Sequence, residues 1–356
     1  MKKQLAVFIG IEDQENIITG GERQLQEMVA GLRRNGINTV FIPIEDVCNK
    51  LPQHVKDYQA KNICVISDYS KRFSLWRMTW KCKYQYGVRV CCSVGAFYFD
   101  YRASKIKNYV DYIVSYLYLK PADLICTTGH AVSQKLRKMG LGGKSIKDIY
   151  PAIRESLIDE AKKDVVAISL GKRIVLTVGR FHPVKGYDYL LDAIHYCKDI
   201  PDIHFVLVGD YDRKPDDYYK KIQKRIQEEG ISHMITIYGK TKNDQELANL
   251  YRRAWCCLHT SVWESSPITV CEALLFGKPV IATNVGGTPE YLNDGEDSLL
   301  VPVKDGAAIW EAISKLYGDQ TLYEHLCSNA ELMAKKYVSR TWTDVGEEYF
   351  QKIMLR

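Results

Sequence analysis

Residues 261–287, SVWESSPITVCEALLFGKPVIATNVGG, decide how this chain folds. The stretch begins with a polar run that contains Pro267, and this composition predicts a loop. The run that follows is mostly apolar and predicts a short helix, which Gly277 ends. Residues 280–282 are apolar again and are typical of a buried strand. Loop, helix and strand in this order indicate a doubly wound α/β domain with a parallel sheet.

Two carboxylates flank the start of this predicted helix. Ser265 or Ser266 is expected to cap it, because a serine oxygen accepts hydrogen bonds from first-turn amides. The remaining unpaired amides of such a turn form a ready site for a phosphate. Glu264 precedes the turn and Glu272 lies inside the helix. Carboxylates repel phosphate but accept two hydroxyls at once, so both are expected to bind sugar hydroxyls. The alternative is that both are solvated surface side chains.

The segment 264–287 resembles the Glu-x7-Glu signature of retaining glycosyltransferases of family 4. Glu264 and Glu272 have the spacing of that signature, and Ser-Ser-Pro stands between them where many relatives have Gly-Phe-Gly. The resemblance implies the GT-B architecture. This is an α/β fold with two Rossmann-like, doubly wound parallel-sheet domains that face each other across a cleft holding the active site.

The length and composition are compatible with two such domains. The chain has 356 residues, and a single hydrophobic core rarely grows beyond about 250–300. Its 46% hydrophobic and 26% charged residues are those of a soluble globular protein. The absence of a run of about 18 apolar residues predicts no transmembrane helix. Eleven cysteines without a Cys-x-x-Cys pair predict reduced thiols of a cytosolic protein.

The pattern of strands gives the domain boundaries. Alternation of strand and helix over the first 150 residues predicts a parallel sheet. We expect an N-terminal, acceptor-binding Rossmann-like domain over 1–153 and a nucleotide-sugar-binding one over 165–337, joined by a linker at 154–171. In GT-B enzymes the last helix crosses back to the first domain, and the resemblance implies the same for about 338–356. The expected strands of the first domain are 5–10, 39–43, 63–67, 88–93, 124–127 and 147–152. The docking stripe of the last helix would be Trp342, Val345, Tyr349 and Ile353.

Basic residues are concentrated in the N-terminal part. Residues 1–160 hold 24 Lys and Arg against 16 Asp and Glu, whereas the remainder holds 25 against 27. This asymmetry indicates a negatively charged partner, such as an anionic membrane surface, a phosphorylated lipid or an anionic glycan. No nucleic-acid-binding motif is present, so nucleic acid is not an expected partner.

Within that part, residues 71–107 hold nine Lys or Arg and one acidic residue, Asp100. If 71–90 is helical, its aromatic residues share one face and its cations lie beside them. Such a face suits an anionic bilayer or a polyprenyl-phosphate acceptor, and the alternative is a helix that packs its aromatics inside the protein. The candidate acceptor contacts are Trp76, Arg77, Trp80, Lys81 and Asp100, the last standing in a run where many relatives carry a His.

A loop in the second domain carries two cations. Gly179 ends an expected strand at 173–178, and Arg180 and Lys185 follow it. Cations in this place can clamp a diphosphate, with about 1.5–3 kcal/mol for each charged hydrogen bond. The alternative is a pair of solvated side chains. The Gly-Arg…Lys-Gly pattern also resembles family 4, where both side chains bind the phosphates of the nucleotide sugar.

The resemblance adds further donor contacts. The pair Gly20-Gly21 would lie near the phosphates and the donor sugar, and the ends of expected strands at 203–208 and 235–238 would border the base. The remaining candidates are Gly179, Gly209, Tyr238, Gly239 and Lys240, with Pro267, Ile268 and Thr269 at the helix start.

The function implied by the resemblance is retaining sugar transfer. The donor would be a nucleoside diphosphate sugar, a UDP-sugar on family grounds, and the acceptor a glycan or lipid-linked glycan, as in cell-surface polysaccharide or glycolipid assembly. Arg180, Lys185 and Glu264 would be catalytic, while Glu272 would hold the ribose. We expect neither a metal nor a cofactor, because cationic side chains and helix amides would hold the diphosphate.

Two other functions fit the same architecture. One is a sugar-nucleotide epimerase, and the other is a non-catalytic regulatory subunit. The expected location is the cytoplasm, with a peripheral position on the inner face of the membrane as the alternative that the basic charge suggests.

Overall fold

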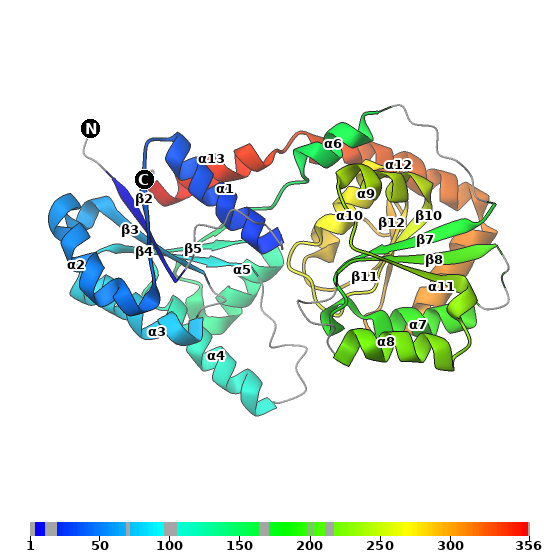
Figure 1. Cartoon of the computed structure of the whole chain (residues 1–356), viewed down its shortest axis with the longest axis horizontal. Coiled ribbons are helices and arrows are strands. Elements are labelled where there is room, and N and C mark those ends of the chain that lie inside the picture. The colour runs from blue at the N-terminus through cyan, green and yellow to red at the C-terminus, as the bar shows by residue number, and fades with distance from the viewer. Residues whose placement is uncertain are drawn as a thin grey trace. The chain divides into compact units, whose positions relative to one another are not determined.

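The computed structural model describes residues 4–10, 20–68, 72–95, 105–163, 171–197, 200, 202–210 and 217–354. The chain divides into two units, residues 1–152 with 341–356, and residues 153–340. Each unit contains a six-stranded sheet whose neighbouring strands are all parallel, with helices on both faces (Figure 1). The predicted α/β class with two Rossmann-like domains is therefore confirmed.

The sheet of the first unit has the strand order β2-β1-β3-β4-β5-β6. The strands are rich in Val, Ile and Cys, and those at the centre are buried on both faces, as parallel sheets require. The elements of this unit are β1 Leu5–Ile9, α1 Gly20–Arg34, β2 Asn38–Ile42, α2 Val47–Tyr58, β3 Ile63–Asp68, α3 Arg72–Trp80, β4 Arg89–Val94, α4 Lys105–Leu119, β5 Leu124–Thr127, α5 His130–Leu136, β6 Ser145–Asp148 and α13 Trp342–Met354.

The last helix of the chain belongs to this first unit. Helices α1 and α13 lie side by side on one face of the sheet (Figure 1). They approach so closely that a Cβ on Gly31 would stand 2.1 Å from the carbonyl oxygen of Gly346. The stripe predicted to dock this helix, Trp342, Val345, Tyr349 and Ile353, is buried.

The sheet of the second unit has the order β12-β11-β10-β7-β8-β9. The strand order reverses between β7 and β10, which are neighbours although two strands separate them in sequence. The elements are α6 Glu155–Ala161, β7 Arg173–Val178, α7 Tyr187–Tyr196, β8 Ile203–Val208, α8 Asp217–Glu228, β9 Ile235–Gly239, α9 Asp244–Arg253, β10 Ala254–His259, α10 Ile268–Leu275, β11 Val280–Thr283, β12 Ser298–Val301, α11 Gly306–Gly318 and α12 Gln320–Val338.

One predicted strand of the first unit is displaced. The strand expected at 147–152 is β6, Ser145–Asp148. Its pairing with β5 ends at Asp148, and Pro151 just beyond lacks the N–H that a longer ladder would need.

Candidate functional site

The loops that follow β7 and β10 meet at the edge of the second sheet. Because the strands are parallel, their carboxyl ends share this edge. Open α/β sheets bind ligands outside these ends, at the point where the strand order reverses. Lys185 follows β7 and Glu264 follows β10, so the chain places a cation and a carboxylate at that point. The two loops are joined by hydrogen bonds from Val262 N to Val184 O (2.8 Å) and from the Thr260 hydroxyl to Lys185 O (2.9 Å).

Glu264 has three contacts on one of its oxygens. Its Oε1 lies 2.5 Å from Lys185 Nζ and accepts a hydrogen bond of 2.7 Å from the Ser261 hydroxyl. The Nε2 of His259 lies 3.2 Å from the same oxygen. Within the described part of the chain no hydrogen bond to Oε2 occurs.

The charge on Glu264 is stabilised by these partners. Burial by itself would raise the pKa of this carboxyl, but the charge of Lys185 and the contact with His259 outweigh burial and hold the pKa well below its ordinary range. Glu264 is therefore a carboxylate at any physiological pH.

The backbone behind Glu264 is supported by a pair of glycines. Gly287 donates its N–H to Glu264 O at 2.9 Å. Gly286 has φ +56°, and a Cβ at that position would stand 1.9 Å from the same oxygen. Only glycine combines this backbone conformation with so close an approach. The pair therefore supports the Glu264 loop directly.

Glu272 lies in α10 and has different partners. Its Oε2 accepts a hydrogen bond of 2.9 Å from the Tyr251 hydroxyl, and its Oε1 lies 3.5 Å from Arg154 Nη2. The side chain is only 7% exposed. Burial raises the pKa of Glu272, and the charge of Arg154 and the Tyr251 hydrogen bond offset this only in part.

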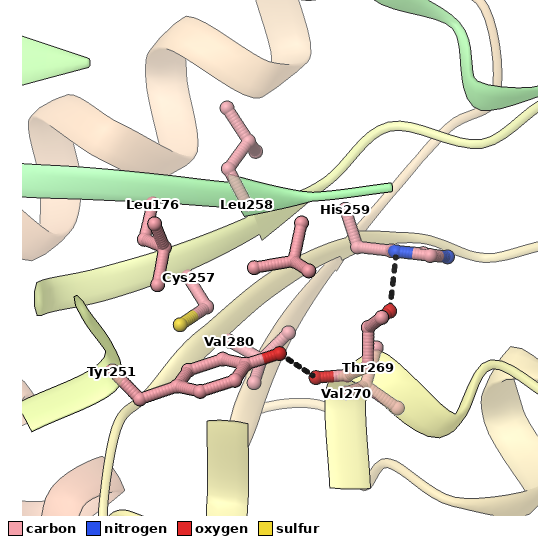
Figure 2. A pocket seen from close by; sticks show the side chains of 9 residues that line it. Leu176, Tyr251, Cys257, Leu258, His259, Thr269, Val270 and Val280 are labelled. Carbon is pink, nitrogen blue, oxygen red and sulfur yellow. Dashed lines mark hydrogen bonds between the residues drawn. The ribbon is translucent and has the colours of Figure 1, made fainter. Parts of the chain in front are cut away.

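A small hollow lies between His259, a contact of Glu264, and Tyr251, the hydrogen-bond partner of Glu272 (Figure 2). Figure 2 shows His259 turned toward Thr269, with 3.4 Å between Nδ1 and Oγ1, and the Tyr251 hydroxyl 3.4 Å from the Thr269 carbonyl oxygen. The first turn of α10 thus contacts His259 on the Glu264 side and Tyr251 on the Glu272 side. The residues that line the hollow are Leu176, Val178, Tyr251, Cys257, Leu258, His259, Thr269, Val270 and Val280.

The start of α10 differs from the prediction. The N-cap is Pro267, with no side-chain cap, so neither Ser265 nor Ser266 caps the helix. The hydroxyl of Ser266 is instead within 2.7 Å of the Tyr291 hydroxyl, and its carbonyl accepts the N–H of Ile268 at 3.0 Å. The amide of Ile268 is therefore already used, and Thr269 remains as the candidate first-turn donor to a phosphate.

The other predicted donor contacts of this unit lie along the same edge. Gly179 and Gly209 follow β7 and β8, and Gly209 N donates to Gly239 O at 2.9 Å. Tyr238 donates to Glu246 at 2.6 Å, and Lys240 Nζ lies 4.0 Å from Asp210, both on an exposed rim. Arg180 is half-exposed in the loop that contains Lys185.

The remaining predicted residues belong to the first unit. Gly20 and Gly21 are the first residues of α1.

The candidate acceptor residues lie on α3 and on a π-helical turn, Lys81–Gln85. The aromatic face is mixed, because Phe73 and Tyr84 are exposed while Trp76 and Trp80 are half-buried, with Trp80 donating to Leu117 O at 2.7 Å. Asp100 lies outside the described residues.

Sequence reasoning missed four partners of the carboxylates, Ser261, Tyr251, His259 and Arg154. His259 ends β10 inside an apolar run, and Arg154 lies in the segment predicted to be a linker. Neither has a motif around it, and only the fold brings Arg154 next to Glu272. A buried histidine at the carboxyl end of a central strand is the one signal that could have pointed to His259.

Comparison with known proteins gives the family context. Residues 158–333 match the family model described as glycosyl transferases group 1. This group 1 region contains Arg180, Lys185, Glu264 and Glu272, together with Tyr251 and His259.

Relatives agree with the group 1 match. An uncharacterized protein of the cps region of Klebsiella pneumoniae is 30% identical over 220 residues, 61% of this chain and 57% of that protein. An uncharacterized glycosyltransferase of Methanocaldococcus jannaschii is 35% identical over 162 residues, 46% of this chain and 43% of the relative. The chain thus spans about half the length of these curated relatives. The name of the Methanocaldococcus relative agrees with the group 1 match.

The fold is shared with solved structures. HepE of Anabaena in complex with UDP has a TM-score of 0.75 and 17% identity, with 97% of this chain and 98% of HepE covered. This likeness confirms GT-B as the fold class.

Two further findings concern the described residues alone. None of their helices is both long and apolar enough to cross a membrane. Their His, Cys, Asp and Glu side chains form no group of three or more that could hold a metal ion.

Proposed function

We propose that this chain is a retaining glycosyltransferase whose donor is a nucleoside diphosphate sugar. The observation that carries the proposal is the contact between Lys185 and Glu264 at the reversal of the strand order, with Glu272 buried in the helix that follows. This is the place where an α/β sheet binds a nucleotide. The glycosyl transferases group 1 match over the same residues supports it.

Each side chain has a role in this proposal. Lys185 and Arg180 bind the diphosphate and stabilise the charge that builds on it as it leaves, with the amide of Thr269 as a further donor. Glu272 holds the ribose hydroxyls. Glu264, whose Oε2 accepts no hydrogen bond from the described residues, binds hydroxyls of the donor sugar. The released phosphate oxygen takes the proton of the acceptor hydroxyl as the new glycosidic bond forms on the same face.

The proposal also states which base the donor carries and that transfer needs no metal. A UDP-sugar is the proposed donor, since the HepE structure of the same fold contains UDP. Two cations of the loop that follows β7, Lys185 and Arg180, can hold a diphosphate by themselves. We therefore propose that transfer needs neither a metal nor a cofactor, and that EDTA leaves turnover unchanged.

The proposed acceptor is a glycan or a lipid-linked glycan. The basic charge of residues 1–160 supports an anionic acceptor or an anionic membrane surface. Trp76, Arg77, Trp80 and Lys81 are the proposed contacts, of which Arg77 lies over the ring of Trp76 at 5.0 Å. A peripheral position on a cytoplasmic membrane face follows, and co-sedimentation with anionic but not neutral vesicles tests it.

Incubation with a panel of UDP-, GDP- and ADP-sugars tests the proposed activity. We expect release of one nucleoside diphosphate, faster with a glycan acceptor, and an anomeric configuration in the product equal to that of the donor. Epimerised sugar nucleotide without diphosphate release would indicate an epimerase instead. A product with the opposite anomeric configuration would refute the retaining mechanism but would still support sugar transfer.

A further inference from the structure

Arg154 stands out among the residues that no motif includes. It is the N-cap of α6, at the beginning of the second unit, and its guanidinium reaches α10. Its Nη2 lies 3.5 Å from Glu272 Oε1, and its Nη1 lies 2.6 Å from Asp244 Oδ1. One arginine thus joins the start of the segment after the first unit to a carboxylate of the candidate site.

The surroundings of Glu272 show why a cation matters there. A buried carboxylate is unstable unless its oxygens have partners. The partner on Oε2, Tyr251, is neutral and fixed, because its ring stacks on Phe276 with centroids 5.4 Å apart. Arg154 is the cation that contacts Glu272 among the described residues, and it does so on the other oxygen.

Arg154 is itself held in place. The carboxylate of Asp244, at the first turn of α9, also accepts a hydrogen bond from the Ser156 hydroxyl. The carbonyl of Arg154 accepts the N–H groups of Leu157 and Ile158, which fixes the backbone at the start of α6. The guanidinium is therefore oriented from two elements before any ligand arrives, although 42% of the side chain is exposed.

We propose that Arg154 is a positioning residue that holds the carboxylate of Glu272 ionised and oriented for a ribose diol. The inference rests on the proposed function, in which Glu272 binds the ribose. Arg154 contacts the protein carboxylate and has no assigned contact with the nucleotide. Its loss should weaken binding only through the ribose hydroxyls.

The test compares UDP with 2′-deoxy-UDP in calorimetric titrations of the full chain. The wild type should prefer UDP. Arg154→Gln should lose roughly three- to tenfold in UDP affinity, as for a partly exposed charged contact, with little change for 2′-deoxy-UDP. Arg154→Lys should recover part of the preference. Arg173→Gln is the matched control, because Arg173 pairs with Asp202 at the opposite end of β7 with a similar exposure of 38%; it should leave the ratio of the two affinities unchanged.

A pH series separates positioning from a general structural effect. The charged or titratable groups near Glu272 are Arg154, Asp244 and Tyr251, with Cys257 on β10. Without Arg154 the carboxyl should need a higher pH to ionise, so Arg154→Gln should regain its preference for UDP as the pH is raised.

The outcomes are distinct. Equal losses for both nucleotides in Arg154→Gln, or an unchanged ratio at every pH, would overturn the inference while leaving the proposed function intact. A wild type that binds UDP without any preference over 2′-deoxy-UDP would remove the proposed role of Glu272, and the inference with it. If UDP does not bind, GDP and ADP are compared with their 2′-deoxy forms in the same way, and failure of all three would refute the proposed function.

Discussion

The two carboxylates Glu264 and Glu272 occupy different electrostatic environments. Glu264 lies in a loop beside Lys185, Ser261 and His259, and its pKa is well below the ordinary range. Glu272 lies in a helix between Tyr251 and Arg154, and burial raises its pKa. The comparison teaches that spacing in sequence predicts that two groups are close in space, whereas their charge states depend on partners from other elements.

The largest expected effect on the rate of sugar transfer comes from removing either Lys185, the partner of Glu264, or Glu272 itself. Lys185→Ala and Glu272→Ala should each lower sugar transfer by about two orders of magnitude or more, at least about 2.7 kcal/mol in transition-state free energy. Each removes a charged group that we propose to contact the donor. Initial rates of nucleotide release with the preferred donor measure the effect.

Lys221→Ala is the control for this pair of variants. Lys221 pairs with Asp188 on the surface, with 60% of its side chain exposed, and should leave the rates unchanged. Because Lys185→Ala removes the lysine that pairs with a buried carboxylate, the fold of this variant is checked by circular dichroism. Near-normal turnover in both site variants would contradict the assignment.

The next largest expected effect is on stability, and it comes from changing Gly286, which supports the backbone of Glu264. Gly286→Ala should destabilise the protein by about 2–3 kcal/mol more than Gly230→Ala, because its Cβ would meet a carbonyl oxygen at 1.9 Å. Gly230 has φ +69°, and a Cβ added there would meet no atom within 4 Å. Gly230→Ala should therefore lose only the roughly 1–2 kcal/mol that a non-glycine residue loses in the left-handed backbone conformation. Urea denaturation measures both, and equal losses would show that the Glu264 loop tolerates displacement.

A pH titration should separate the two carboxylates without any mutation. As the pH falls through the raised pKa of Glu272, that carboxyl takes a proton first, while Glu264 stays ionised. The preference for UDP over 2′-deoxy-UDP should therefore decline in acid by up to about tenfold, since the ratio cancels the titration of the diphosphate. Glu272→Gln should have a low, pH-independent ratio. A wild-type ratio that stays constant into acid would contradict the assignment of the raised pKa.

The smallest effect is expected on the rim, away from both carboxylates. Lys240 lies 4.0 Å from Asp210, with 69% and 47% of the two side chains exposed. Lys240→Ala should change donor affinity by less than about 1 kcal/mol, as for exposed ion pairs. Calorimetry at low and high salt measures this, and a loss comparable to that of Lys185→Ala would make Lys240 a main phosphate ligand.

Much of the fold follows from local sequence patterns. The strands β7, β8 and β5 have the predicted limits, because each is a short apolar run bounded by polar or glycine residues. The buried stripe of α13 has helical spacing, and its docking on the first unit was expected from the family resemblance. The cap of α10 was not, because Ser265 and Ser266 satisfy the usual rule while Tyr291, from a distant loop, takes the Ser266 hydroxyl.

The site was predictable only where residues occur in a motif. Glu264, Glu272 and Lys185 could be named because each has characteristic neighbours in sequence. Arg154 and His259 could not, since their contacts arise from the packing of α6 and β10 against elements remote in the chain.

The central claim is that Lys185, Glu264 and Glu272 surround a nucleoside diphosphate sugar, and calorimetric titration of UDP, GDP and ADP tests it most directly. The account predicts saturable binding of one of the three to the wild type, weakened at least about tenfold in Lys185→Ala by loss of a charged contact. The contradicting result is that none of the three binds at millimolar concentration, or that Lys185→Ala binds the same nucleotide as tightly as the wild type.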